Sequence, residues 1–152
     1  MKAQSKIEFV ITTFIYCLFL VYVIMLFIDN MVSVVYSTRD YSAKITAETI
    51  ADILAQEQGI PPNWYINTSS IKRIGLSSGA PFNLSLQKIN YLNTHCNLIN
   101  NVFHINSYRI RIITSDNITL LNCGSVGNEK AQVEYPVFVN GKIAKLIVEI
   151  WW

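Results

Sequence analysis

The first 58 residues of the chain contain neither glycine nor proline, the two residues that most readily interrupt a helix. Residues 9–28 form a block of 20 without a charged side chain. A helix of that length reaches about 30 Å, the thickness of the hydrocarbon core of a bilayer. Since one short block can cross a bilayer only as a helix, it predicts a membrane-spanning helix. Gly59, Pro61 and Pro62 are the first typical helix-ending residues, so we expect one helix of roughly 50 residues.

A cleavable secretory signal also combines a charged start with an apolar block. Its apolar core is only about 7–15 residues long, and a small-residue cleavage site follows. The block here is longer, and residues 29–33 contain no Ala-x-Ala site, so a retained signal anchor fits better. Lys2 and Lys6 before the block and Asp29 after it predict a cytoplasmic N-terminus and an exported remainder.

Glu8 lies at the edge of the apolar block, where an ionised carboxylate is costly and therefore a candidate for function. One interpretation places Glu8 in the headgroup layer, paired with Lys6 or Lys2. The neighbouring residues offer another. Lys2-Ala3-Gln4, followed by Glu8 and Phe9, resembles the class III signal peptide of archaeal type IV pilin-like proteins.

The resemblance implies that a prepilin peptidase removes residues 1–3 by cutting between Ala3 and Gln4. Residues 4–28 then remain as a helix that spans the membrane or enters a filament core. Glu8 becomes the fifth residue of the mature chain, where the family's glutamate helps to register a subunit against the N-terminal amine of its neighbour. The commoner family pattern is Gln-x-Ser-x-Glu, whereas Ser5 comes one place early here. The likeness extends over roughly the first 90 residues.

Composition limits what the rest of the chain can do. At 152 residues there is room for one domain besides the helix, and the apolar block explains much of the 51% hydrophobic content. Residues 29–152 hold ten Lys and Arg against nine Asp and Glu, a net charge of +1. We therefore expect no nucleic-acid partner.

Residues 29–58 continue the helix with an amphipathic pattern. Apolar side chains recur mostly at three- and four-residue steps and predict a stripe that packs on the exported domain. A face that binds a partner is the alternative. The stripe comprises Met31, Val34, Val35, Ile45, Ile50, Ile53 and Leu54.

Residues 59–152 predict a β-rich exported domain. A loop at 59–64 precedes a short strand at 71–76, and Asn83 can cap a short helix from Leu84 to about residue 93. Arg109 and Arg111 then alternate with apolar residues, which predicts a half-exposed strand that turns at 115–117 and returns through 118–121.

Asn140-Gly141 between two apolar segments is the clearest hairpin signal, because both turn residues need positive φ. Its strands are expected at 133–139 and 142–152, and Pro136 predicts an edge position or a bulge. Together the segments predict an α+β fold, a long N-terminal helix packed on a small antiparallel sheet of about four strands.

Motifs for catalysis and metal binding are missing from the sequence. His95, Cys96 and His104 match no metal-binding spacing, so no metal or cofactor is expected. A Cys–His nucleophile could use Cys96 or Cys123, but nothing nearby would activate the thiol. We therefore expect a protein that is not an enzyme.

Cys96 and Cys123 both fall in the exported region, where they can form a disulfide or remain two buried thiols. Cys17 is an apolar filler within the membrane segment. Sequons for N-glycosylation occur at Asn67, Asn83 and Asn117, although chance sequons are expected in an Asn-rich chain.

The main functional hypothesis is a structural subunit, a minor pilin of an archaeal surface filament. Its expected partners are the membrane, a prepilin peptidase and other pilin subunits. The first alternative is the same domain held in the membrane to bind a ligand without polymerising. The second is an anchored hydrolase, for which no paired acid and base motif is present.

Overall fold

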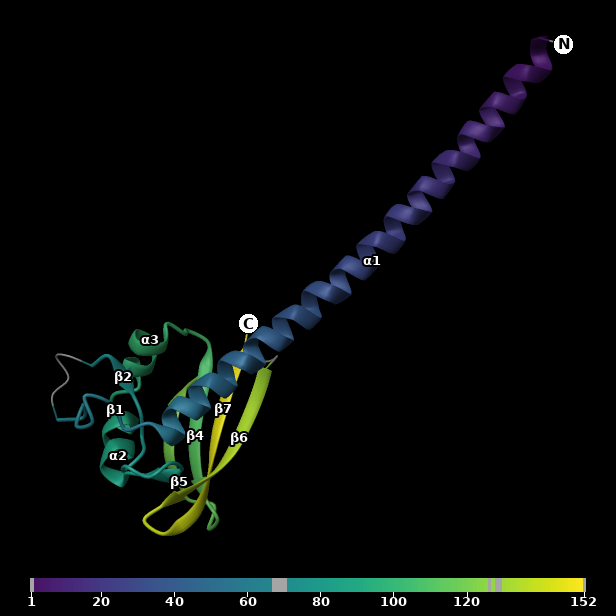
Figure 1. The fold of residues 1–152 in the computed structure, drawn as a ribbon. Coiled ribbons are helices and arrows are strands. Elements are labelled where there is room, and N and C mark those ends of the chain that lie inside the picture. Colours follow the sequence, from purple (N-terminus) through teal and green to yellow (C-terminus); the bar gives the residue numbers. More distant parts are fainter. Residues whose placement is uncertain (1, 67–70, 126, 128–129, 152) are drawn as a thin grey trace. The chain divides into compact units, whose positions relative to one another are not determined.

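The computed structural model describes residues 2–66, 71–125, 127 and 130–151, without the side chains at 2–6, 32, 33, 36 and 130 (Figure 1). Its α+β class confirms the sequence prediction. Helix α1, Lys2–Gln56, begins the chain, and its length follows from the lack of Gly and Pro. The chain divides into two units, Met1–Arg39 and Asp40–Trp152. The end of α1 therefore belongs to the unit that holds the sheet.

The second unit contains a five-stranded sheet with the order β3-β6-β7-β4-β5. Four strands pair with one another in antiparallel fashion, as expected: β4 (Tyr108–Thr114), β5 (Thr119–Gly124), β6 (Lys130–Val139) and β7 (Lys142–Trp151). The fifth, β3 (Asn83–Leu84), is short and runs parallel to β6. A separate two-stranded sheet joins β1 (Gly59–Ile60) to β2 (Arg73–Ile74).

The β6–β7 hairpin confirms its turn signal. Asn140 and Gly141 both have positive φ, 51° and 76°, between the paired residues Val139 and Lys142. Pro136 pairs with Lys145 in an unbroken register. Among the described residues, β3 pairs with β6 only at Phe138 and Val139, the last two residues of β6. No described strand therefore pairs with β6 on that side at Pro136, as expected for a residue without an N–H.

Two helices follow β3. Helix α2, Leu86–Thr94, begins two residues later than expected, and Ser85 rather than Asn83 is its N-cap residue. The prediction of an Asn83 cap is wrong because Asn83 and Leu84 form β3. Helix α3, Asn97–Phe103, was not predicted.

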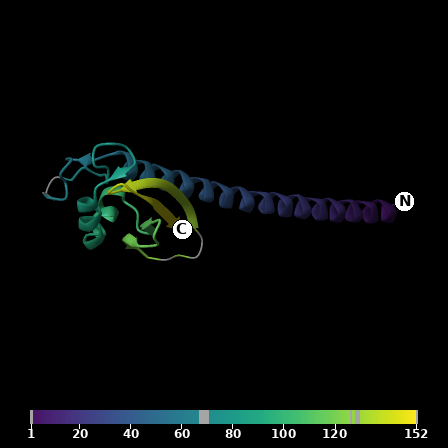
Figure 2. The same cartoon turned by 90° about the horizontal axis from the view of Figure 1, so that it is seen from below.

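The last turns of α1 pack on one face of the sheet (Figures 1 and 2). The buried face consists of Ala47, Ile50, Ala51, Leu54 and Ala55. It matches the predicted stripe in part: Ile50 and Leu54 are buried as expected, whereas Ile45 is 44% exposed. Small alanine side chains let the helix backbone come close to the strands, because the distance between packed elements depends on the side chains at the contact.

Candidate functional site: the apolar surface of helix α1

The first unit exposes apolar side chains along α1. A segment from Ile7 to Met31 is long and apolar enough to cross a membrane, and none of it is buried inside the structure. Phe9 is 72% exposed and Phe27 is 63% exposed. An apolar surface of this size needs a lipid or protein environment, because soluble monomers rarely expose one.

Exposed apolar residues continue after the polar pair Asp29-Asn30. Val34 and Val35 are 59% and 53% exposed. From Ile7 to Val35 a helix measures roughly 43 Å at about 1.5 Å per residue, longer than the ~30 Å hydrocarbon core. In the second unit Tyr41 and Ile45 are also exposed. We call the exposed apolar residues of the first unit, from Ile7 to Val35, the apolar helix surface.

Four polar side chains on the same helix donate hydrogen bonds to its own backbone. The hydroxyls of Thr12 and Thr13 donate to the carbonyl oxygens of Glu8 and Phe9, each at 2.8 Å. Asn30 and Thr38 donate in the same way, to the carbonyl oxygens of Leu26 (2.7 Å) and Val34 (2.8 Å). These bonds let polar residues enter an apolar environment without leaving a donor unpaired.

Glu8 is the ionisable residue at the N-terminal edge of this surface. Its side chain is exposed, and no hydrogen bond or ion pair joins its carboxylate to a side chain that the structure describes. Ala3 and Gln4 lie in the first turn of α1, but their side chains are outside the described part. Cleavage between Ala3 and Gln4 and a role for Glu8 in assembly both stay predictions.

No family model, no curated protein and no solved structure matches this chain.

Hydrogen bonds fasten the end of α1 to the sheet domain. The carbonyl oxygens of Leu54 and Ala55 accept from the backbone N–H groups of Leu76 and Phe82, at 2.9 and 2.8 Å. Lys88, only 5% exposed, donates through Nζ to the carbonyl oxygens of Gln58 (2.7 Å) and Ser77 (2.8 Å). Burial lowers the pKa of Lys88. The bonds to Leu54 and Ala55 satisfy carbonyl oxygens that the end of a helix leaves without partners.

Cys96 and Cys123 form a disulfide, with their Cα atoms 5.3 Å apart. The bond links the residue between α2 and α3 to strand β5. Cys17 is a free, exposed cysteine on α1. Of the three sequons, Asn83 and Asn117 have exposed side chains, whereas Asn67 lies outside the described residues.

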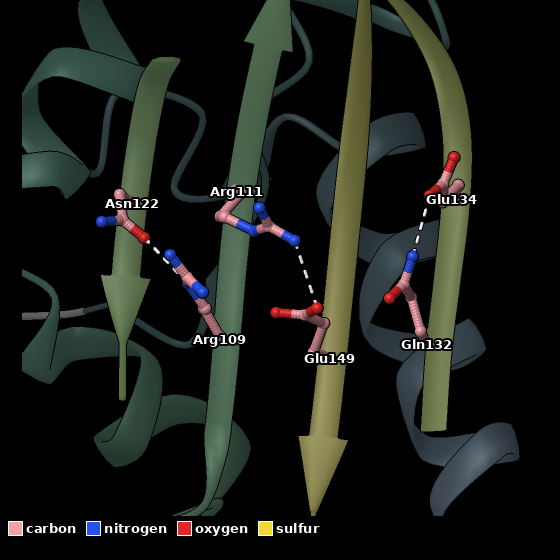
Figure 3. A network of polar contacts seen from close by, with 6 residues as sticks. All are labelled: Arg109, Arg111, Asn122, Gln132, Glu134 and Glu149. Atoms are coloured by element: carbon pink, nitrogen blue, oxygen red, sulfur yellow. Dashed lines mark hydrogen bonds and ion pairs between the residues drawn. The ribbon is translucent and has the colours of Figure 1, made fainter. Parts of the chain in front are cut away.

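The sheet face away from α1 carries paired polar side chains (Figure 3). Arg109 donates to Asn122 (3.2 Å), and Arg111 donates to Glu149 (3.1 Å). On β6, Gln132 donates to Glu134 at 2.8 Å. The predicted alternation of strand β4 is confirmed by its burial pattern. In the described part of the chain no group of three or more His, Cys, Asp or Glu side chains is placed to hold a metal ion.

Proposed function

We propose that this protein is a structural subunit of a type IV pilus-like surface filament, held together by bundled α1 helices. The observation that carries the proposal is the apolar helix surface, which continues past the length that a bilayer covers. A plain membrane anchor leaves Val34, Val35, Tyr41 and Ile45 in water. A helix bundle covers them with the same residues of neighbouring subunits.

Assembly begins with removal of residues 1–3 by a prepilin peptidase. The new amine of Gln4 on one subunit then pairs with the Glu8 carboxylate of another. Support comes from the exposure of Glu8 and from its place at the N-terminal edge of the apolar helix surface. Removing one member of a buried charge pair costs on the order of 3–5 kcal/mol, because the other charge is left unpaired.

The proposed topology places the N-terminus in the cytoplasm and the sheet domain outside. The Cys96–Cys123 disulfide supports this orientation, because disulfides persist in oxidising compartments. Protease added to intact cells should digest the sheet domain while a cytoplasmic control protein survives. Full protection of the domain beside a digested exported control would contradict the topology.

Glu8 provides the first test of assembly. Glu8→Gln should be made, cleaved and inserted normally but should enter sheared filaments poorly, with Glu8→Asp between it and the wild type. The measurement compares sheared filaments with total membrane for each variant. Equal incorporation of Glu8→Gln would contradict a role in assembly and would favour the interpretation that Glu8 lies in the headgroup layer.

The second test separates a filament subunit from an anchored binding domain. Val34→Asn places a polar amide on the apolar helix surface, and Ile45→Asn places one on the exposed part of α1 in the second unit. Both should reduce filament yield at least tenfold while leaving membrane insertion unchanged. Ile118→Asn is the matched control, because Ile118 is 57% exposed in a turn of the sheet domain. Unchanged filaments in the helix variants, or a monodisperse protein that retains Met1, would favour the binding domain.

A further inference from the structure

Three segments of the sheet domain meet around an open hollow of about 370 Å³. They are the turn after β2, the β3–α2 junction and the tip of the β6–β7 hairpin. The polar residues that line it are Ser78, Asn83, Ser85, Gln87 and Asn140. Its volume lies in the range of pockets that hold small molecules.

The hollow offers hydrogen-bonding groups that the fold does not use. Within the described part of the chain, the side chains of Asn83, Ser85 and Asn140 form no hydrogen bond. Gln87 uses only its oxygen, which accepts from Tyr65 at 3.1 Å, so its two N–H donors stay available. An amide carries both donors and acceptors, and a ligand with many hydroxyl groups matches such a set.

Charge is missing from the lining. Every polar residue of the hollow is neutral. Two lysines directly follow lining residues: Lys88 turns its Nζ to Gln58 and Ser77, and Lys142 pairs with Asp116 at 3.0 Å. Leu84 and Leu86 complete the wall. Phe138 pairs with Asn83 across β3 and β6 and is 49% exposed, but it is not one of the residues that line the hollow. Neutral amides and hydroxyls suit a sugar, because each sugar hydroxyl both donates and accepts hydrogen bonds.

We propose that this hollow binds a neutral saccharide. The proposal goes beyond the filament function, because the hollow lies within the sheet domain and needs no neighbouring subunit. The saccharide can be a free ligand or a glycan attached to Asn83, whose side chain lines the hollow and begins an Asn-x-Ser sequon. Both sources present the same hydroxyl-rich chemistry.

The test uses the full chain in detergent and saturation-transfer NMR. The probes are the methyl glycosides of glucose, galactose, mannose and N-acetylglucosamine, with N-acetylneuraminic acid as a charged comparison. Mass spectrometry of the Asn83 peptide reports whether a glycan is attached. A free ligand is the source if unmodified wild type binds a neutral probe. An attached glycan is the source if only Asn83→Gln binds one and the wild type is modified at Asn83.

Asn140→Gly removes one amide while keeping a residue that accepts the positive φ of 51°. It should weaken binding about five- to tenfold, the effect of one lost hydrogen bond. Asn117→Gly is the matched control, because Asn117 has φ 60° in a turn outside the hollow, and its binding should not change.

Three results would overturn the proposal. One is that no neutral probe binds wild type or Asn83→Gln at roughly 20 mM, where even millimolar sites fill. Another is equal binding by Asn140→Gly and Asn117→Gly. The third is a preference for the charged probe. Filament yield does not enter this test, so the saccharide site and the filament function can fail separately.

Discussion

The indole N–H of Trp64 donates a hydrogen bond of 2.9 Å to the carbonyl oxygen of Gly75. Trp64 is fully buried, and its ring meets that of Tyr91 edge to face with centroids 5.8 Å apart. The loop after β1 is thus joined both to the residue after β2 and to helix α2.

Trp64→Phe should lower the free energy of unfolding by about 2–4 kcal/mol. The change leaves the buried Gly75 carbonyl without its donor and opens a space beside Tyr91. Chemical unfolding of the full chain in detergent measures the loss. Trp151→Phe is the control, because Trp151 is half-buried and makes no side-chain hydrogen bond with described residues, so its effect should stay well below that of Trp64→Phe.

Gly75→Ala should prevent the normal fold of the region, because a Cβ there would overlap the carbonyl group of Glu57 and lie 2.6 Å from the backbone N of Gly59. Both groups belong to the backbone, so no side-chain rotation can relieve the overlap. Gly141→Ala is the comparison, since no atom lies within 4 Å and only its φ of 76° opposes alanine. We expect a loss of about 1 kcal/mol at Gly141 and several times more at Gly75. Similar thermal midpoints for the two variants would contradict this explanation.

Replacing Cys96 and Cys123 together by alanine should destabilise the protein by about 3–4 kcal/mol. The disulfide closes a loop with a sequence separation of 27, and opening it restores freedom to the unfolded chain. Cys17→Ala should leave the unfolding midpoint unchanged because Cys17 is free and exposed. Reductant should lower the wild-type midpoint to that of the double variant and leave the double variant unaffected.

Tyr135 should make stability depend on alkaline pH. Burial, followed by a hydrogen bond to the Asp52 carboxylate and the charges of Asp52 and Glu48, raises the pKa of Tyr135 above its ordinary 10.0. Its contribution is fully present below pH 10 and is lost as the pH rises through the folded-state pKa. The difference in unfolding free energy between wild type and Tyr135→Phe should therefore be constant below pH 10 and shrink above it.

Asp52→Asn tests the cause of that shift. Without the carboxylate the folded-state pKa of Tyr135 is raised less, so the alkaline loss of stability should be smaller and should end at a lower pH than in the wild type. A spectrophotometric titration of the tyrosines in folded Asp52→Asn and Tyr135→Phe locates the change. Identical alkaline curves for wild type and Asp52→Asn would remove Asp52 from the explanation.

Local sequence signals predicted the elements that local physics determines. Helix α1 follows from a segment without Gly or Pro, and the β6–β7 hairpin follows from Asn140-Gly141. Strand β4 follows from its two-residue period. Each of these signals lies within the element that it predicts, so no knowledge of distant residues was needed.

Elements that depend on distant partners were missed. Strand β3 exists because Asn83 and Leu84 pair with Phe138 and Val139, and two residues carry no period. The buried alanines of α1 were missed because alanine gives only a weak hydrophobic signal. The polar hollow gathers Ser, Asn and Gln from three segments that only the folded sheet brings together. Glu8, by contrast, is a candidate that its position beside the apolar block indicates from the sequence alone.

The disulfide encloses α3, β4 and most of β5 in a covalent ring. The β4–β5 turn at residues 115–117 is exposed and lies inside this ring. A protease that cuts the turn produces two new termini but does not separate the chain, since each fragment stays bonded through a cysteine. Both strands also keep their places beside one another and, through β4, beside β7. The domain can therefore lose a peptide bond at this turn and remain a single molecule.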